Sequence, residues 1–265
     1  MIKFTVVSSP RAEHQLTHQA AMIGGLRAHG IEAIASLGGA VGTEYVACWG
    51  WRIGQRFRNE GKQVLVMERG YLGDRFAWTS LAWNGLNNRG TFPIISDPSR
   101  FNEHFKLQPW KTGGDYVLLM GQVPGDMSLQ GRDLTGWYNE AVIEAQRAYA
   151  LPVKFRPHPL ALKKGYKNIP FGATLATGTL EDSLAGAAVV VTYNSNSGVD
   201  AVIAGVPTVV SDSGSMAVDV AADKVGRFFR PNREQWAAEL AWKQWSLDEI
   251  RSGFALEHLL AMEPA

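Results

Sequence analysis

The sequence predicts an α/β protein of two Rossmann-like domains that face each other across a cleft. Three observations predict this class. Short apolar runs of strand length alternate with helical segments, as they do where helices cover parallel strands. A loop-rich stretch, residues 70–114, interrupts the alternation near the middle of the chain. The 265 residues are 46% apolar, with 26 Lys and Arg against 25 Asp and Glu, which excludes a disordered chain.

The first half, residues 1–113, has the order expected of a mostly parallel sheet. Helical segments that end at Gly30 and Gly61 separate its apolar runs. The single cysteine, Cys48, falls in one of these runs. It excludes an internal disulfide and a cysteine-built zinc site, and we expect it in the core. The predicted strands are 3–9, 31–36, 45–49 and 63–68, and the predicted helices are 13–29 and 52–59.

The second half, residues 114–265, repeats this alternation and ends in two further helices. We place the boundary between the domains at Gly113 and Gly114, where the loop-rich stretch ends. The predicted strands are 116–121, 153–156, 188–192 and 208–211, and the predicted helices are 135–150, 180–185, 197–204, 233–245 and 247–260.

Several common motifs are missing, and their absence narrows the chemistry. The sequence has no dinucleotide fingerprint, phosphate loop, His-Glu-x-x-His zinc motif or nucleophile elbow. It also lacks an Asp-x-Asp pair, the manganese anchor of one large class of sugar transferases, so we expect no metal and no cofactor. The longest apolar stretch is far below the ~20 residues of a membrane helix. The apolar run at the start of the sequence is too short for a signal peptide. We therefore expect a cytoplasmic protein.

The segment from Tyr193 to Gly198 carries the strongest chemical signal. A buried strand runs into Ser and Asn residues and then into a helix, so hydroxyl and backbone N–H groups converge at the positive end of that helix. Such a turn is typical of a phosphate site. An ordinary Ser or Asn helix cap is the alternative.

Three other predicted strands also end in polar loops. Arg156-Pro157-His158-Pro159 would present an arginine and a histidine rigidly, and both suit phosphate. A proline-rich strand exit is the alternative there. The loop 121–128 contains an amide, a carboxylate and a hydroxyl, which are also common in turns. In the loop 68–75, Glu68 or Asp74 could act as a general base, or could simply pair with neighbouring arginines.

These motifs, taken in order, resemble the bacterial capsule-polysaccharide transferases that use CMP-Kdo. The resemblance covers residues 45–212 and includes Trp49-Gly50, the strand into Glu68, Gly-Gln-Val-x-x-Asp-x-Ser at 121–128, Pro-His-Pro at 157–159 and Ala-Gly-Val-Pro at 204–207. It implies a GT-B glycosyltransferase whose second domain binds the donor nucleotide and whose first domain binds the acceptor without a metal. The donor residues implied are Gln122, Asp126, Ser128, Arg156, His158, Ser195, Asn196, Ser197 and Gly198.

One position departs from that family. The family's proposed base is an aspartate, and here the matching residue is Arg69, which cannot act as a base at neutral pH. The role would pass to Asp74 or Glu68. We expect Asp74 to carry it.

The segment 68–92 also resembles compact glycosyltransferases of bacteriophages, some of which glycosylate hydroxymethylated pyrimidines in their own DNA. Basic and aromatic residues alternate through 69–111, which suits phosphate contact and base stacking, although sugars also stack on tryptophan. The acceptor is therefore either 5-hydroxymethylpyrimidine DNA, in the host cytoplasm of a phage, or a surface glycan or glycolipid. The acceptor-side residues expected are Arg75, Trp78, Trp83 and Asn84.

The function predicted is metal-independent sugar transfer from a nucleotide-sugar to an acceptor hydroxyl, with inversion implied by the resemblance. Two alternatives stay open. A nucleotide-sugar epimerase can share the fold, and a non-catalytic nucleotide-sugar or DNA-binding protein would account for Arg69.

Overall fold

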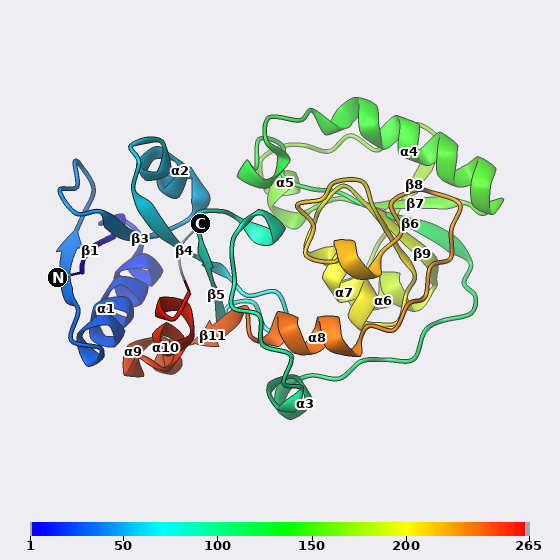
Figure 1. Ribbon diagram of the computed structural model, residues 1–265. Helices are drawn as coiled ribbons and strands as arrows, with labels where there is room; N and C mark the ends of the chain where they lie inside the picture. The colour runs from blue at the N-terminus through cyan, green and yellow to red at the C-terminus, as the bar shows by residue number, and fades with distance from the viewer. Residues whose placement is uncertain (1, 263–265) are drawn as a thin grey trace. The chain divides into compact units, whose positions relative to one another are not determined.

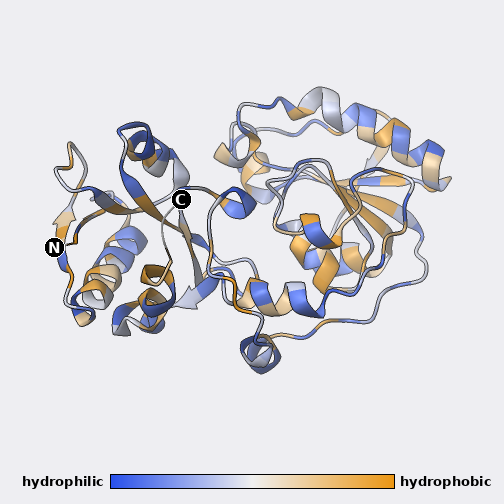
Figure 2. Ribbon diagram, viewed as in Figure 1, coloured by the Kyte–Doolittle hydropathy of each residue, from blue (hydrophilic) through white to orange (hydrophobic). Residues whose placement is uncertain are grey.

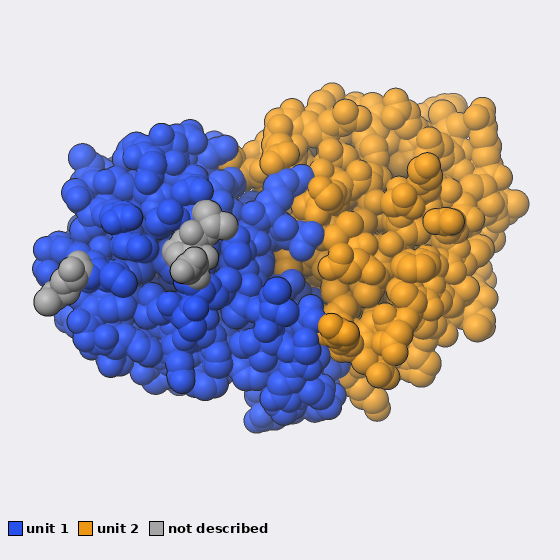
Figure 3. Space-filling view, viewed as in Figure 1, with its two compact units in different colours: residues 1–105, 238–265 blue, residues 106–237 orange. Residues whose placement is uncertain are grey.

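The computed structural model describes residues 2–262, which form two compact units. Unit 1 comprises residues 1–105 and 238–265, and unit 2 comprises residues 106–237 (Figure 3). Each unit is a Rossmann-like α/β layer structure with its own sheet, as the alternation in the sequence predicts. No helix of the described part of the chain is both long and apolar enough to cross a membrane.

The sheet of unit 1 has six strands in the order β11-β5-β4-β3-β1-β2 (Figure 1). Strands β1 to β4 are parallel, whereas β5 runs antiparallel to β4 and β11 runs antiparallel to β5. The strands are β1 (Lys3–Val7), β2 (Glu32–Ser36), β3 (Tyr45–Trp49), β4 (Gln63–Arg69), β5 (Trp78–Trp83) and β11 (Gln244–Ser246). The helices are α1 (Glu13–Ala28), α2 (Trp51–Asn59), α3 (Ser99–His104), α9 (Leu247–Ser252) and α10 (Phe254–Leu260), with a 3-10 turn η1 (Asn87–Arg89).

Two apolar cores cover the two faces of this sheet. On one face, alternate residues of β4 such as Leu65 and Met67 pack with residues of α1, α9 and α10. On the other face, Val64 and Val66 pack with Phe57 of α2 and with Cys48. Cys48 is fully buried, which confirms its expected place in the core, and burial raises the pKa of its thiol to about 12.

The sheet of unit 2 has five parallel strands in the order β10-β9-β6-β7-β8. The apolar strands stand out against more polar helices in Figure 2. Helix α4 packs on one face of the sheet, and α6 and α7 pack on the other. The strands are β6 (Tyr116–Met120), β7 (Val153–Arg156), β8 (Ala173–Leu175), β9 (Ala187–Thr192) and β10 (Thr208–Val210). The helices are α4 (Leu134–Tyr149), α5 (Pro159–Lys163), α6 (Leu180–Ala185) and α7 (Ser197–Ile203), with 3-10 turns η2 (Met127–Leu129) and η3 (Val218–Val220). Helix α8 (Glu234–Ala241) begins in unit 2 and ends in unit 1.

The compact units differ from the expected ranges 1–113 and 114–265 at both ends of unit 2. Residues 106–113 belong to unit 2 because their backbone bonds to it, as where Gln108 N donates to Ile203 O at 2.9 Å and Lys111 N to Gly205 O at 2.7 Å. Residues 238–265 return to unit 1 because β11 pairs with β5.

The tail also differs from the two long helices expected there. The helix predicted over 233–245 ends at Ala241, and β11 follows it. The helix predicted over 247–260 is broken into α9 and α10 at Gly253, whose φ of 91° is left-handed and ends a helix.

Candidate functional site

Two buried amides join the loops that follow β6 and β9 in unit 2. Gln122 Nε2 donates to Asn194 Oδ1 at 2.7 Å, and Asn194 N donates to Gln122 Oε1 at 3.0 Å. The residues are 7% and 2% exposed. A reciprocal pair of this kind fixes both loops, because breaking it would leave buried polar groups without partners. Gln122, predicted to contact the donor, thus serves first to link two loops.

Asn194 connects these loops to a third. Its Nδ2 donates to Ser128 O at 2.9 Å and to Asp212 Oδ1 at 2.8 Å, and the same Asp212 oxygen accepts from Gly214 N at 3.0 Å. Sequence reasoning selected Asn196 from this motif and missed Asn194. The signal that could have found it is its place two residues after the end of an all-buried strand, where a polar side chain must find partners.

The predicted phosphate turn is present and closely hydrogen-bonded. Ser197 donates to Ser195 Oγ from its backbone N–H at 3.3 Å and from its hydroxyl at 2.8 Å. The hydroxyls of Ser195 and Ser197 are therefore hydrogen-bonded to each other at the start of the turn. The Gly198 N–H is used inside the turn, donating to Ser195 O at 2.9 Å. A Cβ on Gly198 would lie 3.2 Å from Thr192 Cγ2, so glycine lets helix and strand approach.

Asp126 and Ser128 act on each other in the loop after β6. Asp126 Oδ1 accepts from Ser128 N at 2.9 Å and from its hydroxyl at 2.7 Å, which caps η2. Both side chains are thus accounted for by the turn.

Arg156 and His158 leave β7 in different directions. Arg156 Nη1 donates to Gly178 O and to Ser183 Oγ, both at 3.0 Å, so it braces the start of α6. His158 Nδ1 accepts from Leu160 N at 3.1 Å and caps α5. Because Nδ1 is the acceptor, the hydrogen of the neutral ring lies on Nε2, which is then a donor suited to a phosphate oxygen.

The two candidate bases of unit 1 differ in their surroundings. Glu68 is half-buried in β4, and its Oε1 would lie 3.5 Å from a Cβ on Gly50. Asp74 is exposed, and its Oδ1 accepts from Phe76 N at 2.9 Å within a turn. Glu68 is therefore held by a strand at the carboxyl edge of the sheet, whereas Asp74 is part of a surface turn.

Arg69 occupies an aromatic and cationic cluster on the α1 face. Its guanidinium carbon lies 4.4 Å from the Phe76 ring centre and 5.2 Å from that of Trp49. His14 and His18 lie against Trp49 at 5.0 and 4.5 Å. Burial lowers the pKa of both histidines, and the charge of Arg69 lowers it further.

Two of the four expected acceptor-side residues are corrected by the structure. Trp83 is 1% exposed, and its Nε1 donates to Leu259 O at 3.0 Å, so it belongs to the core. Asn84, at a left-handed φ of 56°, accepts from Val64 N and donates to Gln63 Oε1, both at 2.8 Å. Its amide continues the sheet and is not a ligand group.

The other two residues keep part of their surface. Trp78 is half-buried against Phe105 and Arg100, and Arg75 Nε donates to Gly70 O at 3.0 Å. The interleaved aromatics expected to stack on DNA are also partly withdrawn from the surface. Four of them are buried in unit 1, namely Tyr71, Trp83, Phe92 and Phe101.

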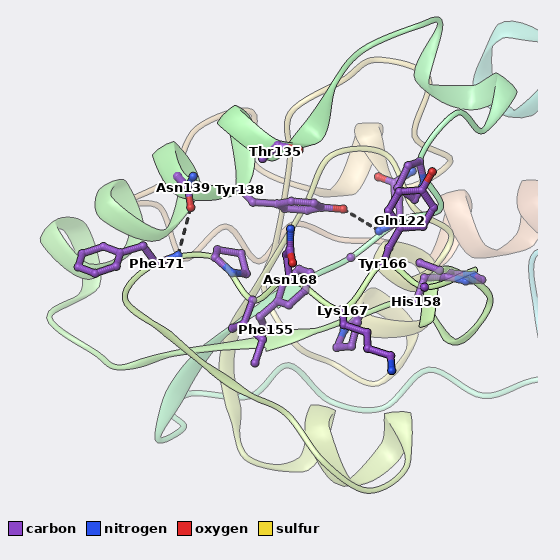
Figure 4. A pocket seen from close by; sticks show the side chains of 17 residues that line it. Gln122, Thr135, Tyr138, Asn139, Phe155, His158, Tyr166, Lys167, Asn168 and Phe171 are labelled. Carbon is purple, nitrogen blue, oxygen red and sulfur yellow. Dashed lines mark hydrogen bonds between the residues drawn. The ribbon is translucent and has the colours of Figure 1, made fainter. Parts of the chain in front are cut away.

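Unit 2 also contains a cavity of about 450 Å³ at the carboxyl ends of β6 and β7 (Figure 4). Gln122 and His158 line it, together with residues of α4 and of the segment 165–171. No group of three or more His, Cys, Asp or Glu residues that could hold a metal ion occurs within residues 2–262.

No protein-family model and no curated protein matches this sequence. Solved structures do match. A β-Kdo 2,4-transferase, KpsC of Thermosulfurimonas dismutans, aligns with a TM-score of 0.59 at 14% identity over 89% of each chain. The β-Kdo 2,7-transferase of the same KpsC aligns with a TM-score of 0.55 at 13% identity over 98% of this chain and 100% of the other.

The chain has the GT-B fold. The expectation of two Rossmann-like domains of that type is thereby confirmed, as is the resemblance to capsule transferases at the level of the fold. The UDP-GlcNAc 2-epimerase of Methanocaldococcus jannaschii aligns with a TM-score of only 0.37 at 12% identity, a likeness too weak to favour the epimerase alternative.

Proposed function

We propose that the chain is a metal-independent glycosyltransferase that moves a sugar from a nucleotide-sugar to an acceptor hydroxyl with inversion. One observation carries the proposal. In unit 2, Asn194 fixes the loops after β6, β9 and β10 to one another at the carboxyl edge of the sheet. Ligands of open α/β sheets bind at this edge. The hydroxyl of Ser195 and the ring of His158 are groups of the kinds that donate hydrogen bonds to phosphate oxygens.

The reaction proposed is a single displacement. The acceptor oxygen bonds to the anomeric carbon of the donor as the bond from that carbon to the phosphate oxygen breaks, and the bonding electrons remain on the phosphate. Donors around Ser195 and His158 stabilise the charge that develops there. The acceptor's proton passes to a carboxylate, and attack opposite the leaving group inverts the sugar.

Glu68 is the better candidate for that carboxylate. A base must hold one position within hydrogen-bond reach of the acceptor, and a side chain on a strand is positioned more precisely than one on a surface turn. Glu68 lies half-buried in β4, while Asp74 is exposed on a surface turn. We therefore prefer Glu68 to Asp74 as the base.

The test is donor consumption followed by mass spectrometry. The protein is mixed with UDP-, dTDP-, GDP- and CMP-sugars, each alone, with hydroxymethylpyrimidine DNA and with a glycan mixture. A mass gain on DNA or glycan identifies the acceptor. Conversion of donor without acceptor would instead establish the epimerase. Binding without turnover under every condition would establish a binding protein.

Two matched variants test the base. Glu68→Gln is expected to lower kcat by about a hundredfold or more, the contribution typical of general-base catalysis. Asp74→Asn keeps the turn and is expected to retain most activity. The reverse result would return the role to Asp74.

A further inference from the structure

The cavity of unit 2 has the size of a small-molecule site, and the proposed reaction does not yet account for it. It lies between α4 and the segment 165–171 that follows α5 (Figure 4). Its volume of about 450 Å³ falls within the range of ligand pockets. Every residue that lines it belongs to unit 2.

Aromatic rings form much of its wall. Tyr138 and Phe155 meet edge to face with their centres 5.1 Å apart, and Tyr166 lies on the side of Gln122 and His158 (Figure 4). Tyr138 is held in place, because its hydroxyl accepts from Gln122 N at 2.8 Å. Fixed aromatic walls favour a flat ring over a flexible chain, since stacking requires little further ordering.

The polar groups of the cavity indicate which flat ring fits. Asn139 Oδ1 accepts from Phe171 N at 3.1 Å, which orients the amide and leaves Nδ2 as a donor. Lys167 and Asn168 add a cation and a second amide. Among the 17 described lining residues there is no Asp or Glu. These groups offer hydrogen-bond donors to the carbonyl oxygens of a base. None of the 17 described lining residues offers a carboxylate, which would accept from the N–H groups of a guanine.

The cavity is continuous with the proposed phosphate residues. Gln122 and His158 line the cavity, and Gln122 is bonded directly to Asn194, the residue before the Ser195 turn. A ligand with a flat ring in the cavity and a phosphate at this edge is a nucleotide.

We propose that this cavity holds the base of the donor nucleotide, and that the base is a pyrimidine with two ring carbonyls, uracil or thymine. The inference rests on the proposed function. It adds the class of donor, which neither the sequence nor the fold supplies.

Calorimetric titration of the full chain tests it. The probes are UMP, dTMP, CMP, AMP and GMP, and inorganic pyrophosphate serves as a probe without a base. UMP and dTMP are expected to bind at least tenfold more tightly than CMP, AMP and GMP. Binding of CMP as tight as that of UMP would overturn the requirement for two ring carbonyls. Tyr166→Ala and Lys167→Ala are expected to weaken UMP about tenfold, the scale of one lost stacking or charged contact. Pyrophosphate binding should not change.

Matched controls come from the preceding turn. Leu162 and Lys164 are exposed and lie outside the lining of the cavity, so Leu162→Ala and Lys164→Ala should leave UMP binding unchanged. Photocrosslinking of 5-iodo-UMP to the unaltered chain gives a second readout, with adducts expected on Tyr138 or Tyr166.

The outcomes separate the two proposals. Nucleotide binding that survives both cavity variants, with crosslinks elsewhere, would overturn the base assignment and leave donor binding in unit 2 intact. Equal affinity for purines and pyrimidines would overturn the choice of base. If pyrophosphate and every nucleotide failed to bind, both this inference and the proposed function would fall.

Discussion

Arg100 and Glu249 form a two-pronged ion pair across 149 positions of the chain, with Nη1 to Oε1 at 2.5 Å and Nη2 to Oε2 at 2.8 Å. Arg100 is 7% exposed and also donates to Ala241 O and Gln244 O, each at 2.9 Å. The rings of Trp78, Trp242 and Trp245 surround its guanidinium. One side chain thereby joins α3 to the C-terminal segment of unit 1.

Removing one partner of this pair should destabilise unit 1 strongly. Glu249→Gln leaves the buried guanidinium without its counter-charge, and we expect a loss of about 3 kcal/mol in the free energy of unfolding, measured in urea by tryptophan fluorescence. The exposed pair Arg251 and Asp248 is the matched control, and Asp248→Asn should cost less than about 1 kcal/mol. Equal effects of the two substitutions would contradict the role given to Arg100.

The same pair makes stability depend on acid pH. Burial of Glu249 raises the pKa of its carboxyl, but hydrogen bonds from Arg100 and the Ser246 backbone outweigh burial, and the net pKa lies below the ordinary 4.5. A lowered pKa stabilises the fold above the unfolded value and loses that contribution as pH falls through the folded one. The free energy of unfolding should therefore decrease as the pH drops below about 4.5. Glu249→Gln should weaken this dependence of the free energy of unfolding on pH. An unchanged dependence would argue against Glu249 as its source.

A negative charge introduced at Asn194 should destabilise the protein more than removal of its amide group. Asn194→Ala removes donors to Ser128 O and Asp212 Oδ1, and we expect a loss of about 2 kcal/mol. Asn194→Asp keeps the shape but sets a carboxylate against Asp212, so it should lower the melting temperature and pyrophosphate affinity further. Asn196→Asp, two residues on, is the comparison. A milder effect of Asn194→Asp than of Asn194→Ala would refute the three-loop link.

Arg69 should report on the two histidines beside it. Its charge contributes to the lowered pKa of His14 and His18, after burial. Arg69→Gln should therefore raise the pKa of both rings in an NMR titration. Arg75→Gln, a neighbouring arginine bonded to Gly70 O, should leave them unchanged. Unchanged pKa values of His14 and His18 after Arg69→Gln would show that the guanidinium does not lie beside these rings.

Most parallel strands could be predicted because they are short runs rich in apolar residues. The short, largely exposed parallel strand β8 and the two antiparallel strands could not. β5 reads Trp-Thr-Ser-Leu-Ala-Trp, and its polar Thr79 and Ser80 are buried. β11 has only three residues, and its Gln244 is buried because Oε1 accepts from Tyr71 N at 2.7 Å and Leu72 N at 2.9 Å. Such partners are distant in sequence, so local patterns do not show them.

The candidate site could also be predicted only where a local sequence pattern shows it. Polar residues after strands β6, β7 and β9 were found because the position of a strand end is a local property. Which of them bond to one another depends on how the loops meet, and this separates Asn194, which joins three loops, from its neighbour Asn196. The burial of Trp83 was likewise missed, because tryptophan suits a sugar platform and a core equally well.

The return of residues 238–265 to unit 1 has a consequence for synthesis on the ribosome. Unit 2 is one continuous stretch, so all of its residues are synthesised before β11 is. Unit 1 begins before unit 2 but lacks β11 and the partner of Arg100 until residues 244–249 are made. Of the two units, the one that is started earlier is therefore completed later, and a nascent chain stalled before residue 238 would leave its sheet edge at β5 unpaired by β11.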